Sequence, residues 1–323
     1  VYAGVFSPGG SLMVSGSFDN LAKLWDLRTG LSVRTFKGHT GGIVAADVSA
    51  DARRIVTGSE DTSIRIWALS SGKSLLKLEG HTDVVSGVYF VPRSSLVISS
   101  SWDRTLRLWS AVDGRMKEEM RGHQHPVTAL AVDWRGRYAA SGDKSGVVAL
   151  WKVGSESLEH KWQGHKGTVS AVTMIPHKEQ FISAGRFGKI HIWDFDDDPK
   201  KVATLAATPQ SAVVSLAVSP NGKWLAAASD DLMVRIWNLS TKTIRHRFKA
   251  HPRVVRALHW HRSGKWLLSG SADKTLKLWK VPKSGAPSLI RGFKGARSEH
   301  KTLPTGTQVF ADLSAVVDHL LEP

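Results

Sequence analysis

Seven tryptophans recur along the chain at an almost constant spacing. Successive spacings are 42, 42, 42, 42, 44 and 42 residues. The tryptophans are Trp25, Trp67, Trp109, Trp151, Trp193, Trp237 and Trp279. A period of about 40–45 residues indicates a repeat architecture, in which each unit stacks on its neighbours because it cannot bury its own apolar faces alone. Most of the chain therefore consists of seven copies of one structural unit.

A second signature accompanies each tryptophan. A histidine lies 28 residues before it in five repeats, and apolar and basic residues alternate just before the tryptophan, as in Ile64-Arg65-Ile66, which predicts a strand. The histidine-containing dipeptides are Gly38-His39, Gly80-His81, Gly122-His123, Gly164-His165 and Ala250-His251. This pattern resembles the WD-repeat family of β-propellers. The resemblance implies an all-β fold, a seven-bladed propeller of four-stranded antiparallel blades.

The resemblance covers residues 1–295, which we take as the propeller domain. Residues Ser288 to Phe293 read like the outer strand at Leu31 to Phe36, so we expect them to complete blade seven, although a segment upstream of Val1 is an alternative. Residues 296–307 read as a polar linker. Apolar residues at helical spacing predict a short C-terminal amphipathic helix at 308–323, which docks on the propeller or, as we favour, on a partner.

Three repeats contain a histidine, a hydroxyl residue and an aspartate, the composition of a hydrolytic triad. Because the set recurs, we expect it to be structural. The resemblance implies that each set joins its tryptophan in a buried tetrad: the carboxylate accepts from the imidazole, the imidazole bonds the hydroxyl, and the hydroxyl accepts from the indole N–H. The three tetrads are His39, Thr57, Asp61 and Trp67; His81, Ser99, Asp103 and Trp109; and His251, Ser269, Asp273 and Trp279.

Other repeats depart from this pattern. Ser145 and Phe187 occupy the aspartate position in blades four and five, while Pro209 and Ala227 replace the histidine and the hydroxyl in blade six. We therefore expect blades four to six to lack the full network and to open more readily than blades two, three and seven.

Composition narrows the function classes. The chain has no cysteine, 41% hydrophobic residues and no apolar run as long as the ~18 residues of a membrane span. No phosphate-binding glycine loop, nucleophile elbow or zinc-hydrolase motif is present, so we expect no enzyme, no cofactor and no metal site. The chain opens at Val1 with no signal segment, which favours a cytoplasmic protein and suggests a fragment.

The first candidate surface is the narrow end of the ring, around the central channel. The resemblance implies that the residue before each blade aspartate, and the residue five after each blade histidine, point into this mouth. Large exposed rings there would be typical of binding hot spots, although Trp102 folding down over its blade is an alternative. The candidates are Tyr2, Phe18, Glu60, Trp102, Lys144, Arg186, Asp230 and Arg256, with Val44, Ser86, Thr128, Ser170, Val214 and Ala272 around them.

The second candidate surface is a basic flank on the last two blades. Between Arg235 and Lys301 there are 17 Lys or Arg and two acids, whereas the rest of the chain has 27 basic and 26 acidic residues; nearly all of the net charge of +16 lies here. Such a field attracts polyanions, although a solvated surface is an alternative. The flank residues are Arg245, Arg247, Lys249, Arg253, Arg262, Lys265 and Lys283.

These features favour a non-catalytic protein-interaction scaffold within a larger assembly, whose partners are protein subunits or peptide segments. The alternative is a nucleic-acid-binding or ribosome-associated module that binds RNA or another polyanion through the basic flank. Stacking of bases on Trp260 or Trp266 would support the alternative if these rings were exposed, but their alternation predicts that at least one is buried.

Overall fold

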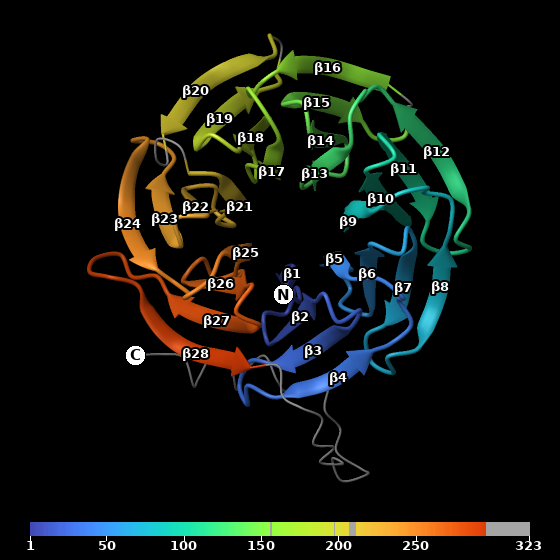
Figure 1. The fold of residues 1–323 in the computed structure, drawn as a ribbon, viewed down its shortest axis with the longest axis horizontal. Coiled ribbons are helices and arrows are strands. Elements are labelled where there is room, and N and C mark those ends of the chain that lie inside the picture. The colour runs from blue at the N-terminus through green and yellow to red at the C-terminus, as the bar shows by residue number, and fades with distance from the viewer. Residues whose placement is uncertain (156, 197, 207–210, 295–323) are drawn as a thin grey trace.

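The computed structural model describes residues 1–155, 157–196, 198–206 and 211–294, and all statements about the structure refer to these ranges. They form seven four-stranded antiparallel sheets arranged as the blades of a closed ring (Figure 1). Each blade is built from consecutive strands, with the first strand innermost and the fourth at the rim. The predicted seven-bladed all-β propeller is confirmed.

The strands occupy equivalent places in every blade. The innermost strands are β1 (Ala3–Phe6), β5 (Ile43–Val48), β9 (Val85–Phe90), β13 (Val127–Val132), β17 (Val169–Met174), β21 (Val213–Val218) and β25 (Val255–Trp260). The second strands are β2 (Leu12–Gly16), β6 (Arg54–Ser59), β10 (Leu96–Ser101), β14 (Tyr138–Asp143), β18 (Gln180–Gly185), β22 (Trp224–Ser229) and β26 (Trp266–Ser271).

The two outer positions are filled in the same way. The third strands are β3 (Ala22–Asp26), β7 (Ile64–Ala68), β11 (Thr105–Ser110), β15 (Val147–Lys152), β19 (Lys189–Asp194), β23 (Met233–Asn238) and β27 (Thr275–Lys280). The rim strands are β4 (Ser32–Phe36), β8 (Ser74–Leu78), β12 (Met116–Arg121), β16 (Ser157–Gln163), β20 (Lys200–Ala206), β24 (Thr243–Lys249) and β28 (Ser288–Lys294).

The apolar core is divided into layers between adjacent blades. Val14 and Phe36 of blade one, for example, pack with Ile55 and Trp67 of blade two in one buried cluster. Each repeated tryptophan packs against the preceding blade in this way, because its strand alternates and its ring points to that face. Burial of a large ring stabilises such an interface by about 3 kcal/mol or more.

The ring closes by the same kind of packing. Trp25 and Met13 of blade one share a buried cluster with Leu268 and Phe293 of blade seven. Strand β28 pairs with β27, so the outer strand of blade seven is the segment predicted for it. The predicted linker and C-terminal helix, residues 296–323, lie outside the described residues.

The antiparallel order of the strands sorts the loops between two ends of the ring. Turns between second and third strands and the loops between blades lie at one end, which we call the narrow end. Turns between first and second strands and between third and fourth strands lie at the other, which we call the opposite end. A residue's loop therefore decides which surface it can serve.

Candidate functional site

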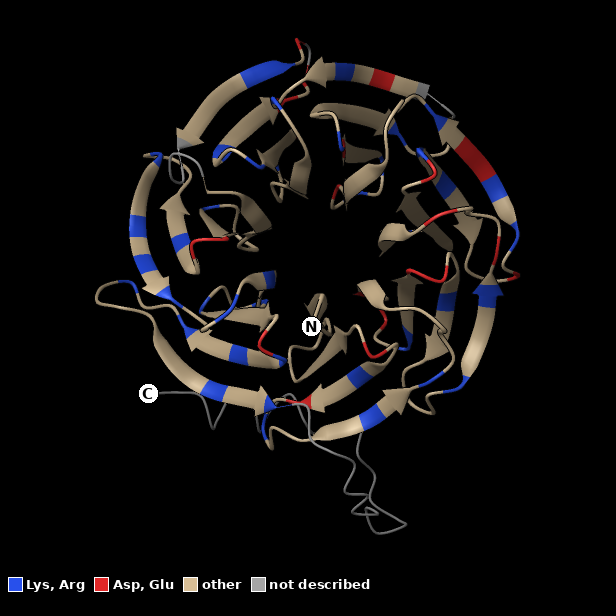
Figure 2. Cartoon of the chain, in the orientation of Figure 1, with Lys and Arg blue, Asp and Glu red and all other residues tan. Residues whose placement is uncertain are grey.

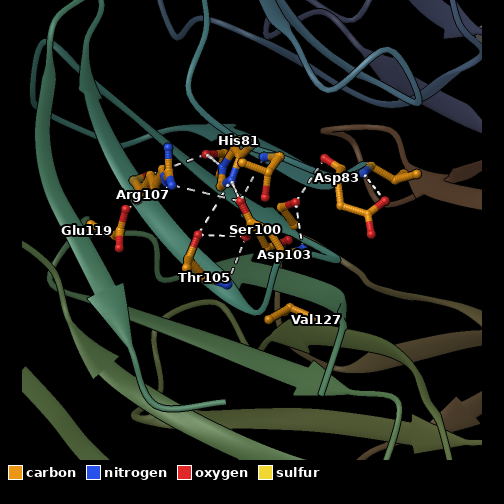
Figure 3. A network of polar contacts seen from close by, with 12 residues as sticks. His81, Asp83, Ser100, Asp103, Thr105, Arg107, Glu119 and Val127 are labelled. Atoms are coloured by element: carbon orange, nitrogen blue, oxygen red, sulfur yellow. Dashed lines mark hydrogen bonds and ion pairs between the residues drawn. The ribbon is translucent and has the colours of Figure 1, made fainter. Parts of the chain in front are cut away.

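The predicted tetrads form in blades two, three and seven. In blade three, His81 Nδ1 bonds Asp103 Oδ2 at 2.6 Å (Figure 3). His81 Nε2 bonds Ser99 Oγ at 2.8 Å, and Trp109 Nε1 donates to Ser99 Oγ at 2.8 Å. Thr105 donates a further bond to Asp103. The corresponding bonds in blades two and seven, through His39 and His251, are 2.7–2.9 Å long.

Burial determines what these groups can do. The hydroxyl residues Thr57, Ser99 and Ser269 are each 0% exposed, so a substrate cannot reach them in the folded protein. Burial alone would raise the pKa of Asp103, but hydrogen bonds from His81 and Thr105 and the charge of His81 hold it well below its usual range. The tetrads are therefore buried hydrogen-bond networks that connect the narrow-end loops to the blade.

Blade four corrects the prediction that it lacks this network. Asp143, two residues before the expected position at Ser145, bonds His123 Nδ1 at 2.8 Å, and Ser141 Oγ bonds both His123 Nε2 and Trp151 Nε1 at 2.7 Å. The substitution works because Asp143 ends strand β14 two residues after Ser141, and residues two apart on a strand share a face. Ser145 then donates to Asp143 at 2.7 Å, so blade four is a fourth complete tetrad.

Blades five and six do depart from the pattern. In blade five, Ser183 bonds His165 and Trp193. The ring of His165 also contacts that of His191 in a tilted arrangement, with ring centroids 4.6 Å apart. Burial and the nearby positive charges lower the pKa of His165 to about 3 and that of His191 to about 4.

Blade six replaces the network by an ion pair. Asp231 binds the buried guanidinium of Arg235, and the indole N–H of Trp237 has no partner among the described residues. Ala227, at the hydroxyl position, offers that N–H no acceptor. Pro209, which we expected at the histidine position, lies outside the described residues.

The narrow-end candidates come together around the mouth of the channel. A cavity of about 600 Å³ is lined by Tyr2, Glu60, Trp102, Arg186 and Arg256, with several of their predicted neighbours. The residue before the aspartate position is held alike in successive blades: the backbone N–H of Trp102 donates to Val84 O at 2.9 Å, for example. Trp102 is 45% exposed, so half of its ring is available at the mouth.

An aromatic and cationic cluster lies beside this mouth, between blades seven and one. The ring centroids of Tyr2 and Phe18 are 6.3 Å apart, and the guanidinium of Arg256 lies 5.2 Å from the centroid of Tyr2. Phe18 is 68% exposed. A second cavity of about 550 Å³ is lined by these three residues together with Asp19 and others. The two cavities adjoin, because Tyr2 and Arg256 line both.

Other predicted mouth residues have different environments. Lys144 and Asp230 are exposed but line neither cavity. The hydroxyls of Ser86 and Thr128 line the mouth but donate to backbone carbonyls of the next blade, Val127 O at 2.7 Å and Val169 O at 2.6 Å. They join neighbouring blades.

Phe187 is a narrow-end residue that was not predicted as part of the surface. It follows Arg186 and is 55% exposed. A phenyl ring cannot accept a hydrogen bond from His165 as an aspartate would, and the ring lies outside the blade. The sequence did contain a signal for this exposed ring, because Phe187 is an apolar residue at the position where other blades have the aspartate of the tetrad.

The basic flank is divided among three surfaces. Arg245, Arg247 and Lys249 are exposed at alternate positions of β24, on the rim, where Figure 2 shows blue bands. Arg253 lies in the loop before β25, at the narrow end. Arg262 and Lys265 lie in or beside the β25–β26 turn and Lys283 in the β27–β28 turn, at the opposite end. The predicted residues thus form no single continuous patch.

Both rings that could have stacked on bases are buried. Trp260 is 3% and Trp266 is 6% exposed, as the alternation of their strands predicts for at least one of them. Within the described ranges, no three His, Cys, Asp or Glu side chains gather as a metal site requires.

No helix in the described part of the chain has the length and apolarity to cross a bilayer.

The closed ring and its repeated tetrads define the class of this protein as a seven-bladed β-propeller. The sequence model of the family described as "WD domain, G-beta repeat" matches seven consecutive segments of the chain. These segments are residues 1–26, 30–68, 72–110, 114–152, 156–194, 199–238 and 242–280. The chain belongs to this family.

Similarity to whole curated proteins is local. Striatin of Homo sapiens is 41% identical over 61 residues, which are 19% of this chain and 8% of striatin. Striatin of Mus musculus and striatin-3 of Bos taurus match with the same identity and coverage. The matching region is thus a small part of these relatives.

Proposed function

We propose that this protein is a non-catalytic interaction scaffold whose narrow end binds a peptide segment of a partner protein. The observation that carries the proposal is the channel mouth, where the exposed ring of Trp102 lines a cavity of about 600 Å³ and that of Phe18 lines the adjoining cavity of about 550 Å³. Aromatic side chains and arginine dominate binding hot spots. Aromatic rings bury much area with few rotatable bonds, and the guanidinium of arginine offers several hydrogen-bond donors in a planar group. Membership of a repeat family that presents a rigid ring is consistent with this role.

The charge at this mouth specifies the kind of segment that fits. Arg186 and Arg256 line the cavity, while Glu60 is the one acid among its lining residues, and its carboxylate accepts from the backbone N–H of Gly42 at 3.3 Å. An extended segment with an apolar anchor for Trp102 and an acidic or carbonyl-rich flank would complement these groups. We further propose that Arg245, Arg247 and Lys249 on β24 contact acidic protein surfaces, and that residues 308–323 dock on a partner subunit.

A comparison of three proteins tests the narrow-end proposal. Wild type, Trp102→Ala and Leu75→Ala are each used to co-purify partners from the native source, and direct affinities are then measured for the partners recovered. Leu75, on the rim strand β8, is 46% exposed and matches the 45% of Trp102, so it controls for loss of exposed apolar area. Trp102→Ala is expected to weaken partner binding by about tenfold or more, as a hot-spot residue does. Equal binding by all three proteins would remove the case for this site.

A further inference from the structure

Four side chains from three successive blades meet at the opposite end of the ring. Trp134, in the β13–β14 turn of blade four, lies between residues of blades three and five, which flank blade four (Figure 1). The guanidinium of Arg135 is 4.4 Å and that of Arg93 is 5.6 Å from the Trp134 ring centroid. The ring centroid of His177 is 4.9 Å from the same indole. We call these four residues the turn cluster.

The backbone at two of these positions is strained. Arg93 has a φ of 61° and His177 a φ of 63°, in the left-handed region that side chains with a Cβ disfavour. The corresponding turns of blades one, four, six and seven place a glycine in this region, and that of blade two places Ala52 there; the glycines are Gly10, Gly136, Gly222 and Gly264. A non-glycine residue there costs about 1–3 kcal/mol, and such strain concentrates at functional sites. Both strained residues bring their side chains onto Trp134.

The cluster presents positive charge that is not neutralised locally. Among the described residues, no acidic side chain forms a salt bridge with Arg93 or Arg135. The nearby Asp133 is 4% exposed, and its carboxylate accepts from the backbone N–H groups of Arg135, Arg137 and Tyr138. Glu179 is held by Arg137 at 2.6 Å. Both acids in the vicinity are therefore already occupied.

Stacking prepares the two guanidinium groups to bind an anion. A guanidinium that lies near an aromatic ring keeps its N–H edge available and is restricted in its rotamers, so less freedom is lost when it binds a carboxylate. A cavity of about 180 Å³ adjoins the cluster. It is lined by Trp134, Arg135, Arg137, His177, Lys178 and Phe195 together with the two occupied acids, Asp133 and Glu179. The indole is already in contact with three side chains, Arg93, Arg135 and His177.

We propose that the turn cluster binds an acidic peptide segment, with Asp or Glu carboxylates accepting from the guanidinium edges of Arg93 and Arg135. This site lies at the end of the ring away from Trp102, and it goes beyond the narrow-end function. A scaffold with both sites holds two partner segments on opposite ends of one rigid ring.

Binding of fluorescein-labelled octaglutamate, followed by anisotropy, tests the site. The test protein carries Arg135→Ala with Arg93→Gly, since glycine accepts the backbone at position 93. The matched control is Arg262→Ala with Lys265→Ala, which removes the same two positive charges from the equivalent turn of blade seven. The test variant is expected to bind about tenfold or more weakly than wild type, because charge-assisted bonds are lost. The control and Trp102→Ala are expected to retain wild-type affinity, which separates this site from the narrow end.

Three results would overturn the proposal. The first is absence of octaglutamate binding by the wild type. The second is an equal loss of affinity in the test variant and in the control variant with Arg262→Ala and Lys265→Ala, which would show only the effect of net charge. The third is octauridylate binding that is stronger than octaglutamate binding and depends on the same two arginines, which would assign the cluster to nucleic acid.

Discussion

Blades three and six have the same fold but different interiors. In both, the residue at the hydroxyl position faces the same partner across the sheet: Ser99 pairs with Arg107, and Ala227 pairs with Arg235. Blade three fastens its tryptophan through Ser99, whereas the indole N–H of Trp237 in blade six has no partner among the described residues. Strand pairing and apolar packing are therefore sufficient for the blade shape.

The tetrad adds something other than shape. It connects the loop between blades, which carries His81, to the turn that carries Asp103, and the residue before that aspartate is Trp102. In blade six the carboxylate of Asp231 turns to Arg235 of its own third strand. We therefore expect the buried polar groups of each blade to determine how strongly its narrow-end loops are attached. They are also expected to determine how the stability of the blade changes at low pH.

The largest expected effect comes from breaking an intact tetrad. His81→Ala leaves the hydroxyl of Ser99 and the carboxylate of Asp103 without their imidazole partner in a buried site. The free energy of unfolding is expected to fall by about 3 kcal/mol, because buried polar groups lose their bonds. Chemical denaturation measures this change.

His125→Ala is the control for that experiment. His125 lies two residues from the tetrad histidine of blade four and is exposed, so its replacement is expected to change stability by no more than about 0.5 kcal/mol. A similar small change for His81→Ala would mean that the tetrads do not stabilise their blades. Blades three and six would then be equivalent in stability.

A smaller effect is expected from acid, through blade five. The pKa values of His165 and His191 lie at about 3 and 4, whereas the ordinary value is 6.5, because burial disfavours the charged rings. The unfolded chain therefore binds protons at a higher pH than the folded chain does. The free energy of unfolding is therefore highest above pH 6.5, where both rings are neutral in either state, and it falls as the pH decreases toward 4. At pH 5 the expected loss is about 2 kcal/mol.

Phe187→Asp sharpens this prediction. It places a carboxylate where blades two and three have Asp61 and Asp103, and this carboxylate favours the protonated form of His165. The loss of stability between pH 7 and pH 5 is expected to be about half that of the wild type. Phe187→Asn, which adds no charge, is the matched control, and His259 titrates alike in all three proteins. An identical pH dependence in the aspartate variant would exclude His165 as the cause.

The fold could be predicted because its signal repeats. The period of the tryptophans and the alternation before each one are enforced by packing at every blade interface, so drift at single positions such as Ser110 or Lys152 does not hide them. The tetrads of blades two, three and seven followed for the same reason. The prediction for blade four was wrong because it looked for the aspartate only at position 145, by analogy with the other blades. The carboxylate of Asp143, two residues earlier, reaches the same histidine.

The turn cluster could not be predicted by the same reading. Arg93, Trp134 and His177 lie 41 and 43 residues apart, close to one repeat, but turns carry no packing constraint that fixes their residue types. Their contact depends on left-handed backbone at two non-glycine positions, which the sequence does not reveal. The division of the basic flank among three surfaces could not be predicted by counting charges along the sequence. Segments that follow one another in the chain lie at different ends of the ring.

The smallest expected effect comes from repairing blade six. Ala227→Ser places a hydroxyl where Ser99 receives the indole N–H of Trp109, so Trp237 gains an acceptor. Ala227 is 0% exposed, and serine occupies this position in other blades at the same register. The unfolding free energy is expected to rise by about 1 kcal/mol, the net contribution of one buried hydrogen bond. Ala226→Ser is the control: it is equally buried but lies on the other face of the sheet, in an apolar cluster that does not contain Trp237, so its hydroxyl is expected to destabilise the protein by about 1–3 kcal/mol. Opposite signs for two adjacent alanines would show that the weakness of blade six is one absent acceptor, whereas a loss of stability in both would place it in the packing of the whole blade.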